Sequence, residues 1–377
     1  MSVTALTKTP QLIQTTPGLD EVISHLSSQS IIAVDTESNS LYAYQERVCL
    51  IQISTREEDF LIDPFAFTDL SSLNPLFQNA GLEKVFHAAE YDIICLRRDY
   101  HFSFENLFDT MIAARILGRK EVGLGSMLEA EFGIHLNKRF QRANWGQRPL
   151  PADLLLYAKD DTHYLLPLRD KLRDELEKRQ LLPLAQEDFQ RMCHNSEHEC
   201  SNGKGDDCWR ISGAYDLPPE TAAILQELCN YRDRMARRFD RPLFKVFSDQ
   251  VLLHLAQHRP SNLEELARIP GLSHRQIERH GRALLQAIQK GLHSPPIYPN
   301  RPSRPSDAYL SRLDSLRTWR KTIAQRMGVP SDVVLPRDVM LRLAAASIHS
   351  AEDLQITLAD VPWRLAHFGD QLLSLLT

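Results

Sequence analysis

Four short runs of apolar residues in the front part of the chain predict β-strands. They cover residues 31–34, 48–53, 59–63 and 84–87. Only short segments separate the first three runs, which suits antiparallel hairpins, whereas helical stretches flank the later part and suit crossover connections. The pattern therefore predicts an α/β domain with a mixed sheet and flanking helices.

From Pro151 onward the apolar positions recur at helical spacing instead. Leucine and alanine follow this spacing through about residue 180 and indicate long amphipathic helices. Residues 215–292 and 308–376 are also helical in pattern, and Ile269-Pro270-Gly271 marks a turn inside the first block. Because the two blocks are similar in size and layout, they suggest a diverged duplication.

Two stretches of unusual composition separate these blocks. Residues 193–208 are polar and contain glycine, and residues 294–306 hold five prolines, so we interpret them as a linker and a stiff connector. The expected segments are a front domain at 1–192, a linker at 193–214, a first helical domain at 215–293, a proline-rich linker at 294–307 and a second helical domain at 308–377.

Charge divides the chain into two unequal parts. Residues 1–209 hold 21 Lys and Arg against 32 Asp and Glu, whereas residues 210–377 hold 23 against 17. An acidic domain repels a polyanion unless its carboxylates hold divalent cations, and a basic domain attracts phosphate backbones by releasing their counterions. Drift in surface charge is the alternative explanation.

The chain contains no apolar run near the roughly 18 residues of a membrane span. Its N-terminus lacks the basic and apolar regions of a signal peptide. We therefore expect a cytoplasmic monomer that does not associate with membranes and whose six cysteines are reduced.

The first candidate motif is Asp35-Thr36-Glu37, at the end of the first apolar run. Alternate side chains of a strand share a face, so both carboxylates point the same way while Thr36 points away. Two acids beside an apolar strand repel each other and lose hydration unless a cation lies between them, and Mg²⁺ and Mn²⁺ prefer such ligands. A solvated strand end is the commoner explanation of such a pair alone.

Two further motifs carry acids on helices. The segment from His87 to Asp92 follows the fourth apolar run and opens a helix, where ordinary capping is an alternative reason for an acid. Tyr157 and Asp161 are spaced i, i+4 and share one helix face, although a packed ring and an exposed acid would give the same pattern. Together the three motifs supply four carboxylates and a phenol, the inventory of a two-metal phosphodiester hydrolase.

These motifs resemble, in order and approximate spacing, the three exonuclease motifs of the DEDD superfamily, in the subclass with tyrosine in the third motif. Supporting phrases are similar to ribonuclease D rather than to a polymerase proofreading domain. They are Leu61-Ile62-Asp63-Pro64, Phe108-Asp109-Thr110, and Trp145 followed by Arg148-Pro149-Leu150.

The resemblance implies a ribonuclease H-like fold and a role for each motif residue. The implied ligands of two divalent ions, Mg²⁺ or Mn²⁺, are Asp35, Glu37, Asp92 and Asp161. Tyr157 would orient the attacking water, and His87 would be structural. Asp160 is the weaker candidate for the third motif because it points about 100° away around the helix.

The back half is similar to the helicase and ribonuclease D C-terminal domain, a helical nucleic-acid-binding module, and residues 308–376 look like a degenerate second copy. Four arginines of the first block share a helix face if the helix extends that far, a lysine follows, and phosphate contact is their expected role. They are Arg234, Arg237, Arg238, Arg241 and Lys245. A solvated basic face bridged to Asp233 and Asp240 is the alternative.

The polar linker also holds a group of cysteines and histidines. Its members Cys193, His194, His198, Cys200 and Cys208 could supply four zinc ligands. The paired C-x2-C spacing of common structural zinc sites is missing, so a plain linker is the main expectation. The chain also lacks the glycine-rich motifs of nucleotide-driven enzymes.

We therefore expect a 3′-5′ exoribonuclease that releases nucleoside 5′-monophosphates from structured RNA with a single-stranded 3′ end, tRNA precursors among its substrates. A 3′-5′ DNA exonuclease is one alternative, because no identified residue would recognise the 2′-hydroxyl. A non-catalytic RNA-binding scaffold on an inactive nuclease fold is the other. The presence of all five motif residues argues against the scaffold.

Overall fold

The computed structural model describes residues 9–194, 207–300 and 304–377, which form two compact units. The first unit holds the front domain, apart from Asn39–Arg47, together with Pro305–Thr377. The second unit holds Asn39–Arg47 and the helical domain within Ser201–Arg304.

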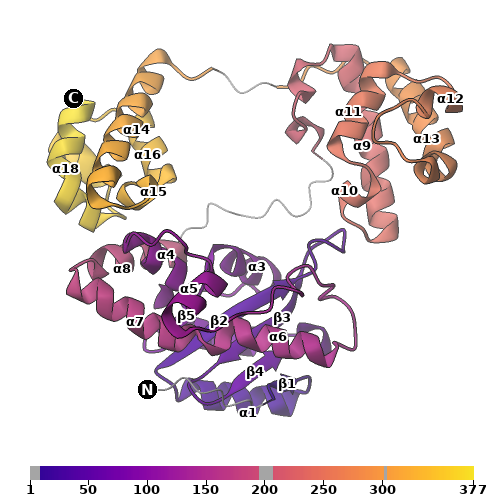
Figure 1. Ribbon diagram of the computed structural model, residues 1–377. Helices are drawn as coiled ribbons and strands as arrows, with labels where there is room; N and C mark the ends of the chain where they lie inside the picture. The colour runs from indigo at the N-terminus through magenta and orange to yellow at the C-terminus, as the bar shows by residue number, and fades with distance from the viewer. Residues whose placement is uncertain (1–8, 195–206, 301–303) are drawn as a thin grey trace. The chain divides into compact units, whose positions relative to one another are not determined.

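A six-stranded sheet with the order β1-β4-β3-β2-β5-β6 forms the centre of the first unit (Figure 1). Its strands are β1 (Gln11–Ile13), β2 (Ile31–Ser38), β3 (Val48–Ser54), β4 (Asp59–Ile62), β5 (Glu83–Phe86) and β6 (Leu107–Asp109). β3 pairs antiparallel with β2 and β4, and the other neighbours are parallel, so the predicted mixed sheet is confirmed. The patterns missed β1 and β6, because three residues are too few to show a period.

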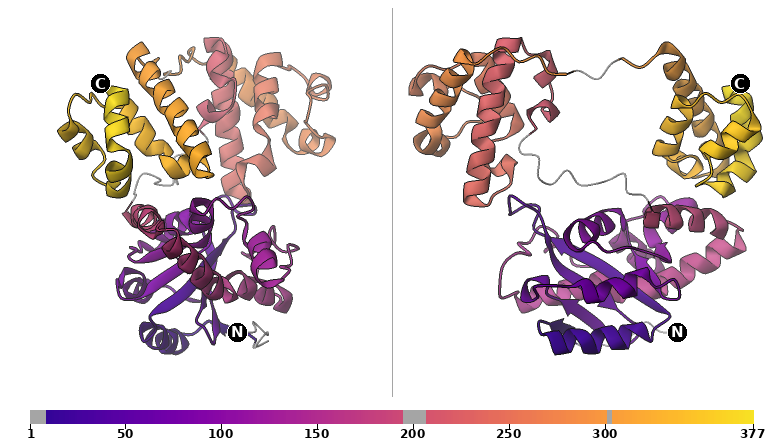
Figure 2. Two further views of the ribbon diagram at one scale, coloured as in Figure 1. Left: turned by 60° about the vertical axis from the view of Figure 1, so that its left-hand side comes forward. Right: turned by 180° about the vertical axis from the view of Figure 1, so that it is seen from behind.

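Helices cover both faces of this sheet (Figure 2). They are α1 (Thr16–Ser27), α2 (Asn74–Gln78), α3 (Glu90–Tyr100), α4 (Thr110–Ile116), α5 (Leu124–Phe132), α6 (Ala152–His163), α7 (Leu165–Lys178) and α8 (Leu182–His194). α6 packs on β2, β3 and β4 above a small apolar cluster that includes Leu50, Leu61 and Trp145. Burial of these side chains fixes α6 over the strand that carries the first motif.

The second helical domain packs against α8 within the same unit. Its helices are α14 (Asp307–Met327), α15 (Ser331–Val334), α16 (Arg337–Ala345), α17 (Ala351–Thr357) and α18 (Pro362–Leu376). Val329, Val333 and Trp363 of this domain join the hydrophobic core of the front domain. The domain is therefore docked on the front domain, which the sequence patterns did not indicate.

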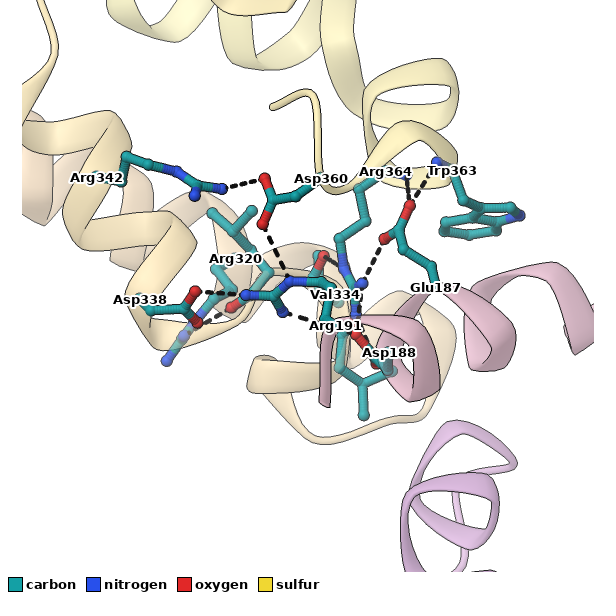
Figure 3. A network of polar contacts seen from close by, with 12 residues as sticks. Glu187, Asp188, Arg191, Arg320, Val334, Asp338, Arg342, Asp360, Trp363 and Arg364 are labelled. Atoms are coloured by element: carbon teal, nitrogen blue, oxygen red, sulfur yellow. Dashed lines mark hydrogen bonds and ion pairs between the residues drawn. The ribbon is translucent and has the colours of Figure 1, made fainter. Parts of the chain in front are cut away.

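A buried arginine is at the centre of this contact. The Arg364 side chain is completely buried, and its guanidinium lies 2.5 Å from a carboxylate oxygen of Glu187 and 2.7 Å from one of Asp188 (Figure 3). It also donates to the carbonyl oxygens of Val333 and Val334. Glu187 accepts from the backbone N–H of Trp363, in the first turn of α18 where orphan donors need partners. α8 thus supplies both counter-charge and helix cap.

Further contacts surround this buried group. Arg191 of α8 pairs with Asp338 and Asp360. Gly118 has φ +75°, and a Cβ there would lie 2.6 Å from the carbonyl oxygen of Gly328, so this approach requires glycine.

The second unit is built on α9 (Pro219–Phe239) and α13 (His274–His293). Three shorter helices complete it: α10 (Leu243–Val246), α11 (Asp249–His258) and α12 (Leu263–Leu266). The turn predicted at Ile269-Pro270-Gly271 lies between α12 and α13 and is confirmed. The hydrophobic core of the second unit includes Cys208. This residue lies in the first of two short 3₁₀ turns, Cys208–Arg210 and Ala214–Asp216.

The cysteines differ from the expectation in one pair. Cys208 and Cys229 form a disulfide with their Cα atoms 6.0 Å apart, so the prediction that all six cysteines are reduced is wrong here. The disulfide removes Cys208 from the candidate zinc ligands, and Cys193 is buried in the core of the first unit. His198 and Cys200 lie outside the described residues.

In the part of the chain that the structure describes, no helix is both long and apolar enough to span a membrane.

Candidate active site

The first motif lies inside β2, which extends four residues beyond the predicted run, to Ser38. In the antiparallel ladder Asp35 is opposite Gln52 of β3, and Glu37 is opposite Leu50. Directly opposed residues share a face of the sheet. Since Leu50 belongs to the apolar cluster under α6, both carboxylates lie on the face that α6 covers.

The loop before α3 positions Asp92. Asp109, at the end of β6, accepts from the backbone N–H of Ala89 at 2.7 Å and of Ile112 at 2.9 Å, which ties the starts of α3 and α4 to the sheet. Asp92 then lies in the first turn of α3 and is only 7% exposed.

Thr36 has a role that the strand pattern did not predict. Its hydroxyl donates to the carboxylate of Asp92. The strand pattern predicted only that Thr36 points away from Asp35 and Glu37, and it gave no partner for the hydroxyl. α3, whose first turn carries Asp92, packs against β3 and brings this acid within reach of the Thr36 hydroxyl.

The third motif completes the cavity. Tyr157 and Asp161, one turn apart on α6, line a cavity of about 310 Å³ together with Asp35 and His87. The opposite wall is formed by Gly123, Leu124, Gly125, Ser126, Leu136, Asn137, Lys138 and Gln141. No sequence pattern pointed to this wall, because its residues lie in a loop and a helix start without a repeating signal.

Neighbouring side chains hold the motif residues in place. The Tyr157 ring packs beside Trp145 and Phe140, with centroids 6.1 and 5.9 Å away. His87 Nδ1 lies 2.9 Å from the Thr110 hydroxyl oxygen, consistent with the structural role implied for it. Asp160 does not line the cavity and pairs with Lys159 at 3.4 Å.

The acids share an environment that disfavours their charged forms. Burial, followed by repulsion from Asp92 and Asp161, raises the pKa of Asp35 well above its usual value. Burial and the same two neighbours raise the pKa of Glu37. Burial raises the pKa of Asp92 and of Asp161 to about 7 each. No arginine or lysine is among the causes of these four shifts.

Buried oxygen donors that repel one another, and whose pKa shifts no lysine or arginine offsets, fit a hard divalent ion. Among the described residues, however, no three His, Cys, Asp or Glu side chains already converge in an ion-binding geometry. The chemistry of the donor set therefore fits metal binding, and ion binding would require these carboxylates to turn toward a common centre.

Comparison with known families agrees with this geometry. Residues 10–177 match the 3′-5′ exonuclease family. The chain therefore contains a 3′-5′ exonuclease domain. Residues 221–288 and 310–376 each match the HRDC domain, so the predicted second copy is confirmed. The exonuclease domain has the ribonuclease H-like mixed sheet, and enzymes of the DEDD group generally use divalent metals.

The chain also resembles individual proteins. It is 34% identical over 284 residues to Protein RRP6-like 3 of Arabidopsis thaliana, covering 67% of this chain and 31% of that protein. It is 31% identical over 299 residues to Exosome complex exonuclease RRP6 of Saccharomyces cerevisiae, covering 76% of this chain and 41% of that protein. The chain thus spans about a third to a half of the length of such curated relatives.

A solved structure extends the likeness to nearly the whole chain. Escherichia coli RNase D, described as an exoribonuclease involved in structured RNA processing, superposes with a TM-score of 0.71 at 26% identity. The match covers 98% of this chain and 99% of that one. The likeness therefore extends beyond the exonuclease domain to the helical domains of this chain.

The predicted nucleic-acid-binding arginines lie on the first HRDC domain. Arg234, Arg237 and Arg238 are exposed on α9. The helix ends at Phe239, and Asp240 adopts a left-handed conformation, so the prediction that Arg241 shares this helix face is wrong. Lys245 follows on α10.

Part of this basic surface is covered by residues 39–47, which belong to the same unit. Tyr44 lies with its hydroxyl 2.5 Å from Asp233 and accepts from Arg237 at 2.9 Å. Lys245 Nζ lies 4.1 Å from the centre of the Tyr42 ring. Arg234, Arg238 and Arg241 are also exposed, and they take no part in these contacts.

Proposed function

We propose that the protein is a metal-dependent 3′-5′ exoribonuclease. The observation that carries the proposal is a partly buried cavity lined by Asp35, Asp161 and Tyr157, with Glu37 and Asp92 close enough to Asp35 for their charges to raise its pKa. Four such carboxylates are suited to two divalent ions, Mg²⁺ or Mn²⁺. The likeness to RNase D and RRP6 proteins, whose names specify RNA or the exosome exonuclease, supports RNA as the polymer.

Each motif residue has a defined task in this proposal. Asp35, Glu37, Asp92 and Asp161 would hold the ions, which would supply a hydroxide nucleophile and stabilise the leaving 3′ oxygen. Thr36 donates to Asp92 and so limits the positions its carboxylate can take. Asp109 fixes the start of α3 and with it the position of Asp92.

Tyr157 would orient the attacking water. Burial, with repulsion from Asp161, Glu37 and Asp35, raises its pKa far above the usual value, so the phenol stays neutral at physiological pH. A neutral phenol can donate a hydrogen bond and accept another, but it is not a general base here.

Basic residues of the first HRDC domain would bind the phosphate backbone of the RNA. Arg234, Arg237, Arg238, Arg241 and Lys245 supply positive charge for phosphate contacts that carry little sequence information. We further propose that its substrates include tRNA precursors with single-stranded 3′ ends. We also propose that the protein is cytoplasmic and monomeric.

Digestion of 5′-labelled RNA tests the proposed exoribonuclease activity. The substrate has a structured body and a single-stranded 3′ tail, and wild type is compared with Asp35→Ala in Mg²⁺, Mn²⁺ or chelator. We expect a stepwise ladder from the 3′ end that requires metal and Asp35. An equal rate on a DNA tail would favour a DNA exonuclease, and salt-sensitive binding without any ladder would favour an inactive scaffold.

A further inference from the structure

Gln52 is a buried polar side chain to which the mechanism assigns no task. It lies in the middle of β3 and is completely buried. Neither its amide nitrogen nor its amide oxygen has a hydrogen-bond partner, and only two other described residues, Trp145 and His254, have a buried side-chain atom in that condition.

The register of the sheet places Gln52 beside the first motif. It is directly opposite Asp35 on β2 and opposite Leu61 on β4. Opposed side chains of an antiparallel pair have Cβ atoms roughly 5 Å apart on one face, so Gln52 and Asp35 are neighbours on the face that α6 covers.

The two residues of β3 that flank Gln52 on the same face of the sheet, Leu50 and Ser54, have no side-chain polar group without a hydrogen-bond partner. Leu50 is apolar and packs in the cluster under α6. Ser54 donates to Asp59 at 2.6 Å and lies 2.6 Å from the Thr162 hydroxyl. Of these three side chains on one face of β3, only Gln52, opposite Asp35, has polar atoms without a hydrogen-bond partner.

An unsatisfied buried amide is costly. A buried donor or acceptor left without a partner keeps the full cost of its lost hydration, whereas an apolar side chain of the same length would avoid that cost. Such a group calls for an explanation, and a catalytic role is one of the recognised ones. Beside a carboxylate, an amide can donate to that carboxylate and accept from a neighbouring water.

We propose that Gln52 is a positioning residue that acts through Asp35, an inference that rests on the proposed metal-dependent function. When an ion is bound, Nε2–H of Gln52 donates to the Asp35 carboxylate and restricts its rotation, and Oε1 is free to accept from water near the ion. Hydrogen bonds of this kind to a ligand typically change metal affinity by about 10- to 100-fold.

A purely structural explanation is available for comparison. Trp145 is buried under the same helix, and its Nε1–H also lacks a partner. If a small rearrangement joined the indole N–H to the Gln52 amide oxygen, Gln52 would serve packing alone. Loss of Gln52 or of the indole N–H would then destabilise the fold in the same way, and ion binding would not change.

The test compares the full chain with Gln52→Met, which keeps length and volume and removes the amide. Titration calorimetry measures Mn²⁺ binding in the absence of RNA, and scanning calorimetry measures the melting temperature in chelator. Digestion of the tailed RNA gives kcat and KM. We expect Mn²⁺ affinity and kcat each to fall about 10-fold or more with KM unchanged. The melting temperature in chelator should stay the same or rise, since an unsatisfied amide has been removed.

Ser54→Ala, which removes satisfied hydrogen bonds from the same strand face, is the matched control. It should lower the melting temperature and leave Mn²⁺ affinity unchanged. The inference is overturned if Gln52→Met lowers the melting temperature in chelator as Trp145→Phe does and keeps wild-type Mn²⁺ affinity. If wild type itself binds Mn²⁺ no better than Asp35→Asn and makes no ladder, the proposed function has failed instead.

Discussion

At the residue scale, burial rather than mutual repulsion is the larger cause of the raised pKa values of the site acids. α6 closes over β2 and removes water from Asp35 and Glu37, and the site supplies no arginine to offset this loss. An enzyme that binds cations there gains from the arrangement, because a divalent ion can supply the missing positive charge.

Tyr157→Phe tests the phenol directly. The ring packs between Trp145 and Phe140, so the variant should fold normally. Loss of the hydroxyl removes only the contact to the attacking water, and we expect kcat to fall roughly 100-fold with KM for RNA nearly unchanged. Single-turnover digestion at several RNA concentrations measures both. A large rise in KM with unchanged kcat would instead assign Tyr157 to substrate binding.

Lys84 allows a pH prediction away from the site. It is completely buried in β5, and its ammonium donates to the carbonyl oxygens of Asn79 and Leu82, each at 2.8 Å. Burial lowers the pKa of Lys84 from 10.5 to about 8. Above pH 8 the unfolded chain therefore binds more protons at this residue than the folded chain does, so stability rises with pH.

Between pH 7 and 9 the free energy of unfolding of wild type should increase by about 1 kcal/mol relative to Lys84→Met. Urea unfolding in chelator at pH 7, 8 and 9 measures it. Lys290→Met, which changes an exposed lysine, should follow the wild-type pH dependence. Parallel curves for wild type and Lys84→Met would show that Lys84 keeps an ordinary pKa.

At the element scale, helix ends determine which side chains reach the functional surfaces. Asp109 caps α4 and holds the loop that starts α3, and so determines where Asp92 lies. The end of α9 at Phe239 separates Arg241 from the arginines of the helix. In both cases one or two residues at a terminus decide the position of a charged group.

Arg238→Ala tests the basic surface of α9. Arg238 is exposed and stacks only on its neighbour Phe239, 5.7 Å from the ring centre. Loss of one phosphate contact should weaken RNA binding about equally for all sequences and reduce the slope of log K against log salt by roughly 1. Filter binding at several salt concentrations measures this.

Arg210→Ala, which removes another exposed arginine of the same unit, serves as the control and should leave the slope unchanged. A sequence-dependent loss for Arg238→Ala would contradict a pure phosphate contact.

At the scale of the whole molecule, the second HRDC domain is part of the same compact unit as the exonuclease domain. Arg364 of α18 is surrounded by Glu187, Asp188 and two carbonyl oxygens, so every part of its guanidinium has a partner. Burial raises the pKa of Glu187 even beside Arg364. Removing the arginine would take the guanidinium from both carboxylates and leave Glu187 only its backbone donors from α18.

Arg364→Ala should therefore destabilise the docked domain by roughly 3–5 kcal/mol. We expect residues 305–377 to unfold at a lower denaturant concentration than the rest of the first unit. A denaturant titration that monitors tryptophan fluorescence, to which Trp319 and Trp363 contribute, measures this transition. Arg342→Ala removes only a partly exposed pair with Asp360 and should cost at most about 1 kcal/mol. Equal effects of the two variants would show that the buried arginine is not the main anchor.

The sequence alone was sufficient for features that depend on local period and spacing. Alternation and helical spacing identified four strands and the helical blocks, since both follow from backbone geometry. The same spacings placed Asp35 with Glu37 and Tyr157 with Asp161 on shared faces, and the structure has both pairs there. The motif residues could therefore be named without knowledge of the fold.

Only the tertiary structure decided features that depend on long-range contacts. The proximity of Thr36 to Asp92, the unsatisfied amide of Gln52 opposite Asp35, and the docking of Arg364 onto α8 each join segments far apart in sequence. Periodicity contains no information about such pairs, because it reports which face a residue lies on and not what covers that face.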